Sequence, residues 1–328
     1  MTLAVSPTRQ RAIFWVFVLI DVILWVLAFS WKPPRLDSAP IVAVNIWPGT
    51  ESLIAAREMG KVTTREINFV EMSWSSSAMR AFGNRAIDAS VLALSEVLLM
   101  RELGYPIRVI MAVDESVGAD AIVAGPGING VPELRGKRVG VEIRSVGHYL
   151  LGRALQDAGM SIDDVELVPV VLPEIETAFT ELGVDAVVAA EPWLSRINAR
   201  GGRVIYDSAD TPGEIIRVMI ARDVVIERSP APLGKLLDAH FRLADPTDWS
   251  EDARVGILRR EGVSAPEFDR IRKGVRLYSR TDQTSMLSGE SPSLTAALDR
   301  VAARMRELDL LTGGTNNRLE IDDRFVTP

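Results

Sequence analysis

Short apolar runs of strand length alternate with amphipathic segments of helix length from residue 41 onward. The first part of this pattern predicts strands over 41–47, 65–72, 87–94 and 107–113, with helix-length segments after the first three. Nearly continuous Val, Ile and Leu runs that alternate with helices are typical of a parallel sheet covered on both faces. We therefore expect an α/β fold with parallel-type sheets.

The same alternation starts again after the glycine-rich segment 125–136, which predicts a second α/β lobe. From residue 222 the pattern becomes mostly helical, which predicts a helical tail on the surface. The elements expected in this half are strands over 137–143, 164–170 and 184–190, helices over 145–160 and 173–183, and surface helices within 248–273 and 294–311.

The first 39 residues contain an apolar run, Ile13–Trp31, in which Asp21 is the only charged residue. As a helix rising about 1.5 Å per residue, this run reaches about 30 Å, the thickness of a bilayer's hydrocarbon core. Arg9 and Arg11 precede it, which favours a cytoplasmic tail and export of the remainder. We expect one transmembrane anchor followed by a linker; the alternative is a cleaved signal and a soluble periplasmic protein.

Composition excludes several functions. The 328 residues include 37 Lys and Arg against 44 Asp and Glu, and the net charge of −7 disfavours binding to nucleic acid. The absence of cysteine excludes disulfides, thiolate metal sites and a cysteine nucleophile. His148 and His240 are the only histidines, so a histidine-based metal site or catalytic relay is not expected either. We predict a protein that is not an enzyme and needs no cofactor or metal.

Four blocks of sequence carry a resemblance to a known family. The most specific, over 134–168, is similar to a run of Leu-x-Gly-Lys-x-Val-Gly-Val followed by a serine turn and a helix ending in Ala-Gly. The other three cover 82–110, 184–197 with its Glu-Pro-Trp, and the closing segment 316–326. Together they resemble the ABC-transporter solute-binding proteins of the nitrate/sulfonate/taurine class, over roughly Pro40 to Phe325.

This resemblance implies a two-lobed type 2 periplasmic-binding-protein fold with the ligand in the cleft. One lobe would combine residues 40–123 with 222–328, and the other would be 124–221, with two strands between them as a hinge. The sequence departs from the family at Arg144, where a glycine is usual, and in keeping its long N-terminal helix without a lipid-acceptor cysteine.

The function implied is that of an extracytoplasmic component of an ABC importer, with a permease and an ATPase as partners and the inner membrane contacted through the N-terminal helix. The expected solute is a small polar organic molecule, sulfonate- or taurine-like or pyrimidine-like. Two alternatives stay open. One is a membrane-anchored sensing subunit, and the other is an enzyme like the thiamine-pyrimidine synthases, which rely on a cysteine-rich iron motif absent here.

Candidate ligand-binding residues follow the predicted strands, because open parallel sheets bind ligands at the carboxyl ends of their strands. Hydroxyls and free N–H groups at helix starts suit an anionic or hydrogen-bonding solute. An ordinary βα turn or N-cap is the alternative interpretation. The candidates in the first lobe are Trp47, Pro48, Gly49, Ser75, Ser76, Ser77 and Ser95.

In the second lobe, Ser145 is expected to cap a helix, Gly147 to leave its first turn bare and His148 to line the cleft. Glu191 is expected to pair with a ligand amine, and its alternative role is to stabilise its own helix N-terminus. Further expectations are that Trp193 covers the ligand, that Gly213 adds to the cleft or forms a hinge turn, and that His240 is structural.

Overall fold

The computed structural model describes most of the chain after the predicted anchor. The described residues are 39–288, 293–313 and 320–326, together with Trp15, Val18, Leu19, Asp21 and Val22. The chain divides into two units, Met1–Ser38 and Ala39–Pro328, and the fold described below is that of the second. The membrane helix expected over 13–31 lies outside the described residues except for those five, and it stays a prediction. Within the described part, no helix has the length and apolarity needed to span a membrane.

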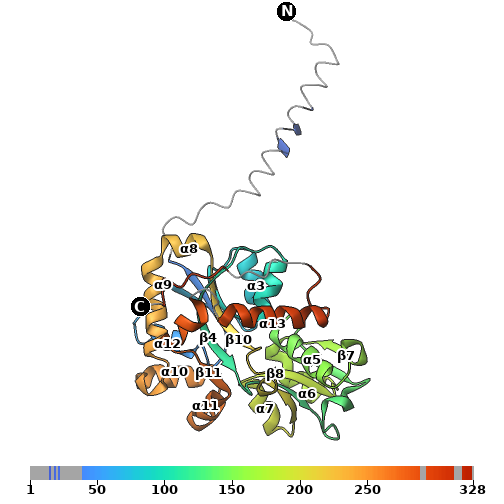
Figure 1. The fold of residues 1–328 in the computed structure, drawn as a ribbon. Helices are drawn as coiled ribbons and strands as arrows, with labels where there is room; N and C mark the ends of the chain where they lie inside the picture. Colours follow the sequence, from blue (N-terminus) through green and yellow to red (C-terminus); the bar gives the residue numbers. More distant parts are fainter. Residues whose placement is uncertain are drawn as a thin grey trace, which may run out of the picture. The chain divides into compact units, whose positions relative to one another are not determined.

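The second unit contains a six-stranded sheet in the order β11-β4-β10-β3-β1-β2. Strands β4 and β10 lie side by side in this sheet (Figure 1). Its strands are β1 (Ile41–Val44), β2 (Asn68–Glu71), β3 (Ala89–Ala93), β4 (Arg108–Ser116), β10 (Ile216–Ala221) and β11 (Val275–Leu277). Strand β1 is parallel to both β2 and β3, whereas β10 runs antiparallel to β3 and β4. Strand β11 is also antiparallel to its neighbour β4.

A second sheet has five strands in the order β7-β6-β8-β5-β9. They are β5 (Asp120–Ala124), β6 (Arg138–Val141), β7 (Glu166–Pro169), β8 (Ala186–Ala190) and β9 (Arg203–Asp207). Strand β6 is parallel to β7 and β8, and β5 is antiparallel to β8 and β9.

Both sheets are therefore mixed, and the expectation of parallel-type sheets was too simple. Parallel neighbours need a crossover connection that usually contains a helix. Strand β5 follows β4 with only residues 117–119 between them, and β10 follows β9 without an intervening α-helix. Each of these two strands enters its sheet directly from the other sheet and runs against its neighbours.

The chain changes sheet twice, after Ser116 and again before Ile216. The predicted lobe boundaries at 123 and 221 grouped β5 and β10 with the opposite sheet. The reason is physical: all residues of β4 after its first, and all of β5 and β10, are buried, so an apolar run does not reveal which sheet it joins.

Helices cover both sheets. Contacts place α9 and α10 on α2, and α13 on α4, so the helical tail packs on the first sheet's half. Leu233 and Leu294 from this tail share one core cluster with Val42 and Val109. The α-helices are α2 (Glu51–Glu58), α3 (Ser75–Gly83), α4 (Leu94–Glu102), α5 (Val146–Asp157), α6 (Ile175–Glu181), α7 (Trp193–Ala199), α8 (Asp223–Arg228), α9 (Pro230–Arg242), α10 (Glu251–Glu261), α11 (Ala265–Ile271), α12 (Arg280–Leu287) and α13 (Ser293–Glu307). The short 3₁₀ helices are η1 (Val131–Leu134), η2 (Ile162–Asp164), η3 (Leu172–Glu174), η4 (Ser208–Asp210), η5 (Pro246–Asp248) and η6 (Arg272–Gly274).

Candidate functional site

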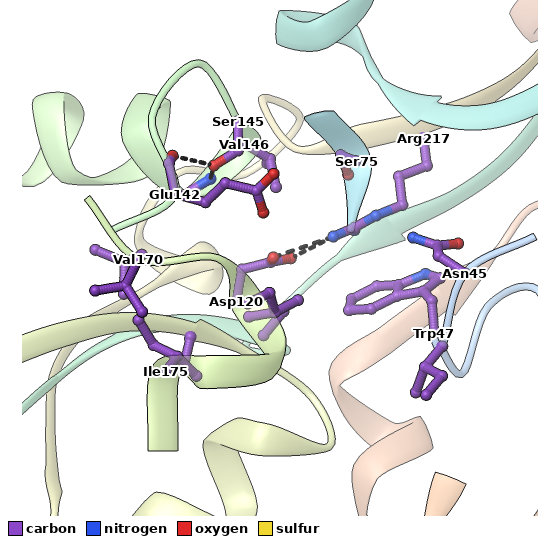
Figure 2. Close-up of a pocket in the computed structure, with 16 residues that line it drawn as sticks. Asn45, Trp47, Ser75, Asp120, Glu142, Ser145, Val146, Val170, Ile175 and Arg217 are labelled. Carbon is purple, nitrogen blue, oxygen red and sulfur yellow. Dashed lines mark hydrogen bonds and ion pairs between the residues drawn. The ribbon is translucent and has the colours of Figure 1, made fainter. Parts of the chain in front are cut away.

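A pocket lies between the two halves of the second unit and is lined by residues from both sheets (Figure 2). Its lining includes residues that follow β1, β6 and β7 and the last residues of β8, together with the start of β5 and a residue of β10. One side is polar and the other apolar. The polar lining consists of Asn45, Ser75, Asp120, Glu142, Ser145 and Arg217, and the apolar walls include Ile46, Trp47, Val170, Leu172, Ile175 and Val188.

Arg217 lies on the polar side of this pocket. Its Nη2 donates to both carboxylate oxygens of Asp120 at 3.0 Å, and its Nη1 lies 3.6 Å from Asp114 Oδ1. Its Cζ is 3.5 Å from the centroid of the Trp47 ring. Burial opposes the charge, but the two carboxylates hold the pKa of Arg217 above its ordinary value. Because Arg217 is on β10 and Asp120 is on β5, their ion pair joins the two sheets.

Asp114 is fully buried next to Arg217 and Trp47. Its Oδ2 accepts a hydrogen bond of 2.9 Å from Trp47 Nε1, and burial raises the pKa of Asp114 to about 6. A Cβ at Gly49 would lie 2.1 Å from Asp114 Oδ2 and 2.6 Å from Trp47 Nε1, so only glycine fits there without displacing them. Gly49 and the neighbouring Pro48 are buried and are absent from the pocket lining; Gly49 makes room for the carboxylate that holds Trp47.

Two helix N-termini at the pocket are capped by carboxylates from the opposite half. The Ser76 N–H of α3 donates to Glu142 Oε1 at 3.1 Å, and the Val146 N–H of α5 donates to Glu96 Oε1 at 3.1 Å. Burial raises the pKa of both Glu142 and Glu96. The helix ends expected to accept an anion are therefore already occupied by the protein's own carboxylates.

The five candidate serines have different environments. Ser75 and Ser145 line the pocket, as does Gly147. Ser145 Oγ caps α5 as expected, because it accepts from the Gly147 and His148 N–H groups and donates to the Glu142 carbonyl. The remaining three, Ser76, Ser77 and Ser95, lie outside the lining. The Ser77 hydroxyl donates to the carbonyl of Trp74, the N-cap residue of α3.

His148 is half-buried on the first turn of α5 and is not part of the pocket lining. Its Nδ1 accepts from the backbone N–H of Arg144 at 3.3 Å, and burial together with the Arg144 charge lowers the pKa of His148. Arg144 has a φ of +61°, a left-handed conformation that favours glycine. This geometry explains why the resembled family usually has a glycine at that position.

Glu191 and Trp193 are buried but do not line the pocket. The Glu191 carboxylate accepts from the N–H of Ser195 at 3.1 Å and from its Oγ at 2.8 Å, which stabilises the start of α7. Trp193 packs in a core cluster of the second sheet. These contacts agree with the alternative role considered for Glu191, and its pairing with a ligand amine stays an untested prediction.

Gly213 has a φ of +74° and donates its N–H to Glu115 Oε1 at 2.7 Å, just before β10. Gly213 therefore lies in a tight turn and does not line the pocket, and its part in a hinge stays a prediction. His240 is fully buried, and its Nδ1 lies 2.6 Å from Ser52 Oγ. Burial lowers the pKa of His240 to about 4, so it is a neutral core residue at physiological pH.

Four polar lining residues were missed in the sequence: Asn45, Asp120, Glu142 and Arg217. Arg217 interrupts an otherwise apolar strand, and such a buried charge was a detectable signal. Glu142 directly follows β6 and obeys the same strand-end rule that selected Trp47. Asn45 Oδ1 is buried without a hydrogen-bond partner among the described residues, which leaves it available to a ligand.

Two comparisons of sequence find proteins and a family to which the chain is similar. The NMT1-like family model matches residues 41–257, well over half of the chain. The taurine-binding periplasmic protein of Escherichia coli (strain K12) is 25% identical over 226 residues, which cover 65% of this chain and 70% of that protein. A protein of Brucella abortus (strain 2308) named for a binding function is 25% identical over 146 residues, 42% of this chain; the match covers 46% of that relative, about half its length.

Solved structures share the fold. The alkanesulfonate-binding protein SsuA of Xanthomonas axonopodis pv. citri, bound to MOPS, has a TM-score of 0.73 at 16% identity, covering 89% of this chain and 99% of that one. The desulfurization enzyme DSZB has a TM-score of 0.62 at 16% identity, covering 88% and 97%. The α/β periplasmic-binding-protein fold expected from the sequence is confirmed, and this fold also occurs in an enzyme. Because the family model matches more than half of the residues, the chain belongs to the NMT1-like family.

Proposed function

We propose that the chain is the solute-binding component of an ABC importer and that it captures a small polar organic solute in the pocket between its two sheets. The observation that carries this proposal is the lining, which both sheets supply. A solute contacted from both halves favours the conformation in which the halves are closed on it. The relatives named for taurine and alkanesulfonate binding support a sulfonate- or taurine-like solute, and a pyrimidine-like one is the alternative.

Sheet membership supports a division into two lobes that differs slightly from the one expected in the sequence. One lobe consists of the strands up to β4 together with β10 and the C-terminal helices, and the other contains β5 to β9. The connections at 117–119 and 208–215 form the hinge. Two short connections between compact lobes are the usual arrangement for closure around a ligand.

The apolar segment 13–31 anchors the protein in a bacterial inner membrane, with the binding domain in the periplasm. A permease and an ATPase are its partners in this arrangement. Cleavage after the apolar segment would give a soluble periplasmic protein with the same binding domain. The proposal includes binding of the solute without its chemical conversion. This has to be stated separately, because the same fold occurs in both binding proteins and an enzyme.

A thermal-shift screen of the full chain tests this function. The compounds are alkanesulfonates, aminosulfonates and pyrimidines. At a hundredfold excess over Kd, a bound solute stabilises the folded state by about 2.7 kcal/mol, which raises Tm by roughly 4 °C for a chain of this size. Small-angle scattering with the strongest stabiliser should show a smaller radius of gyration. A screen without a stabilising compound, or consumption of the compound during incubation, contradicts the proposal.

A further inference from the structure

The charged side chains of the pocket do not suit a simple anion. Asp120 and Glu142 face Arg217 across the polar side, so the lining has an excess of carboxylates (Figure 2). The one cation of this lining is already held by Asp120 and by Asp114. A sulfonate that approached Arg217 would have to displace a buried carboxylate, and the helix N-termini nearby are capped by Glu96 and Glu142.

Glu142 is the carboxylate of the lining that Arg217 does not neutralise. Its carboxylate points into the space between Ser145, Asp120 and Ser75 (Figure 2). Hydrogen bonds to it come from the Ser76 N–H and hydroxyl and from the Leu172 backbone, and the Arg80 charge also favours its charged form. A partly desolvated carboxylate of this kind gains most from a bound cation that also donates hydrogen bonds.

We propose that the solute carries a protonated amine that pairs with Glu142, so that it is an organic cation or an amine-bearing zwitterion rather than a simple anion. This rests on the proposed solute-binding function. The apolar walls at Val170, Leu172 and Val188 contact the hydrocarbon part of the solute. Arg217 acts as a positioning residue that holds Trp47 and the two sheets together.

Three probes of similar size separate the possibilities: taurine with both charges, ethanolamine with only the cation, and ethanesulfonate with only the anion. Calorimetric titration of each into the full chain is expected to show binding of taurine and ethanolamine and much weaker binding of ethanesulfonate. Glu142→Gln removes the charge-assisted contact and should weaken both amines on the order of tenfold to a hundredfold. Glu142→Asp keeps the charge at shorter reach and should give an intermediate loss.

Glu181→Gln is the matched control, because Glu181 is an exposed carboxylate on the same half of the molecule. It should bind all three probes like the wild type, and thermal melts confirm that each variant is folded. The inference is overturned if ethanesulfonate binds as tightly as taurine, if neither amine binds, or if Glu142→Gln leaves amine binding unchanged. If the thermal-shift screen then identified a simple anion that stabilises the protein, the proposed solute-binding function would still hold. Only the preference for an amine would be wrong.

Discussion

Replacing Asp120 by asparagine tests whether the Arg217 ion pair holds the two sheets together. The substitution keeps the shape of the side chain and removes its charge. Arg217 is 5% exposed and Asp120 is 2% exposed, so water does not replace the lost partner. The carboxylate nearest to the guanidinium is then Asp114, which lies 3.6 Å from Nη1 in contrast to the two 3.0 Å hydrogen bonds to Asp120.

The expected cost follows from this geometry. Removing one partner of a buried ion pair destabilises a protein by about 3–5 kcal/mol, because the other charge stays buried and uncompensated. Since Asp114 still faces Arg217, we expect the lower end, about 3 kcal/mol, or a decrease in Tm of roughly 5 °C. Arg217→Met should cost a similar amount. The double variant should lose at least about 1 kcal/mol less free energy of unfolding than the sum of the two single variants. The reason is that each single substitution leaves a buried charge without its partner.

Urea unfolding of the three variants and the wild type measures these free energies, with the slope of the transition showing whether the unfolded surface is unchanged. Glu166→Gln is the control, because it breaks an exposed pair with Arg138 and exposed pairs contribute little. The reasoning is refuted if Asp120→Asn is as stable as Glu166→Gln. Strict additivity of the two single substitutions would also refute it.

Three further substitutions have outcomes fixed by local geometry. Gly49→Ala should lower the free energy of unfolding by about 1–3 kcal/mol in a urea titration, because its Cβ would overlap Asp114 and Trp47; a variant as stable as the wild type would mean that the site has more room. Burial raises the pKa of Asp114 from 3.8 to about 6, so the folded state holds this proton to higher pH than the unfolded state. Stability from this group is therefore lost as pH rises from about 4 to about 6. In urea titrations across that range, the wild type should lose about 3 kcal/mol more than Asp114→Asn, in which the other buried carboxylates still titrate. Glu191→Gln should lower Tm through a loss of about 1 kcal/mol at the start of α7 while leaving solute affinity unchanged in calorimetry, and a tenfold weaker affinity would return Glu191 to the binding site.

The alternation of apolar runs with amphipathic segments was sufficient to predict an α/β chain with a helical tail. It was insufficient to predict which sheet a strand joins. Strands β5 and β10 are apolar runs like their neighbours, but each enters its sheet from the other one and pairs in the antiparallel direction. That pairing depends on contacts between residues far apart in the sequence, which no local periodicity contains.

The strand-end rule predicted four lining residues, Trp47, Ser75, Ser145 and Gly147. It also selected Glu191, whose carboxylate the structure uses to stabilise its own helix. A helix start attracts the same residue types whether or not a ligand binds there, and this limits the rule.

The rule could not find Arg217 and Asp120, which lie within or at the start of strands. Their approach depends on how the two sheets meet, and the sequence does not contain that geometry.

Blocking the pocket tests the central claim most directly. Ser75→Phe places a large side chain at the pocket from a half-buried position, and Ser73→Phe adds the same group two residues earlier at an exposed one. The measurement is a calorimetric titration of the strongest stabilising compound from the screen into the wild type and both variants. We predict that Ser75→Phe abolishes binding while its Tm stays near that of Ser73→Phe, which binds like the wild type. Equal affinity of the two variants would contradict the assignment of this pocket as the solute-binding site.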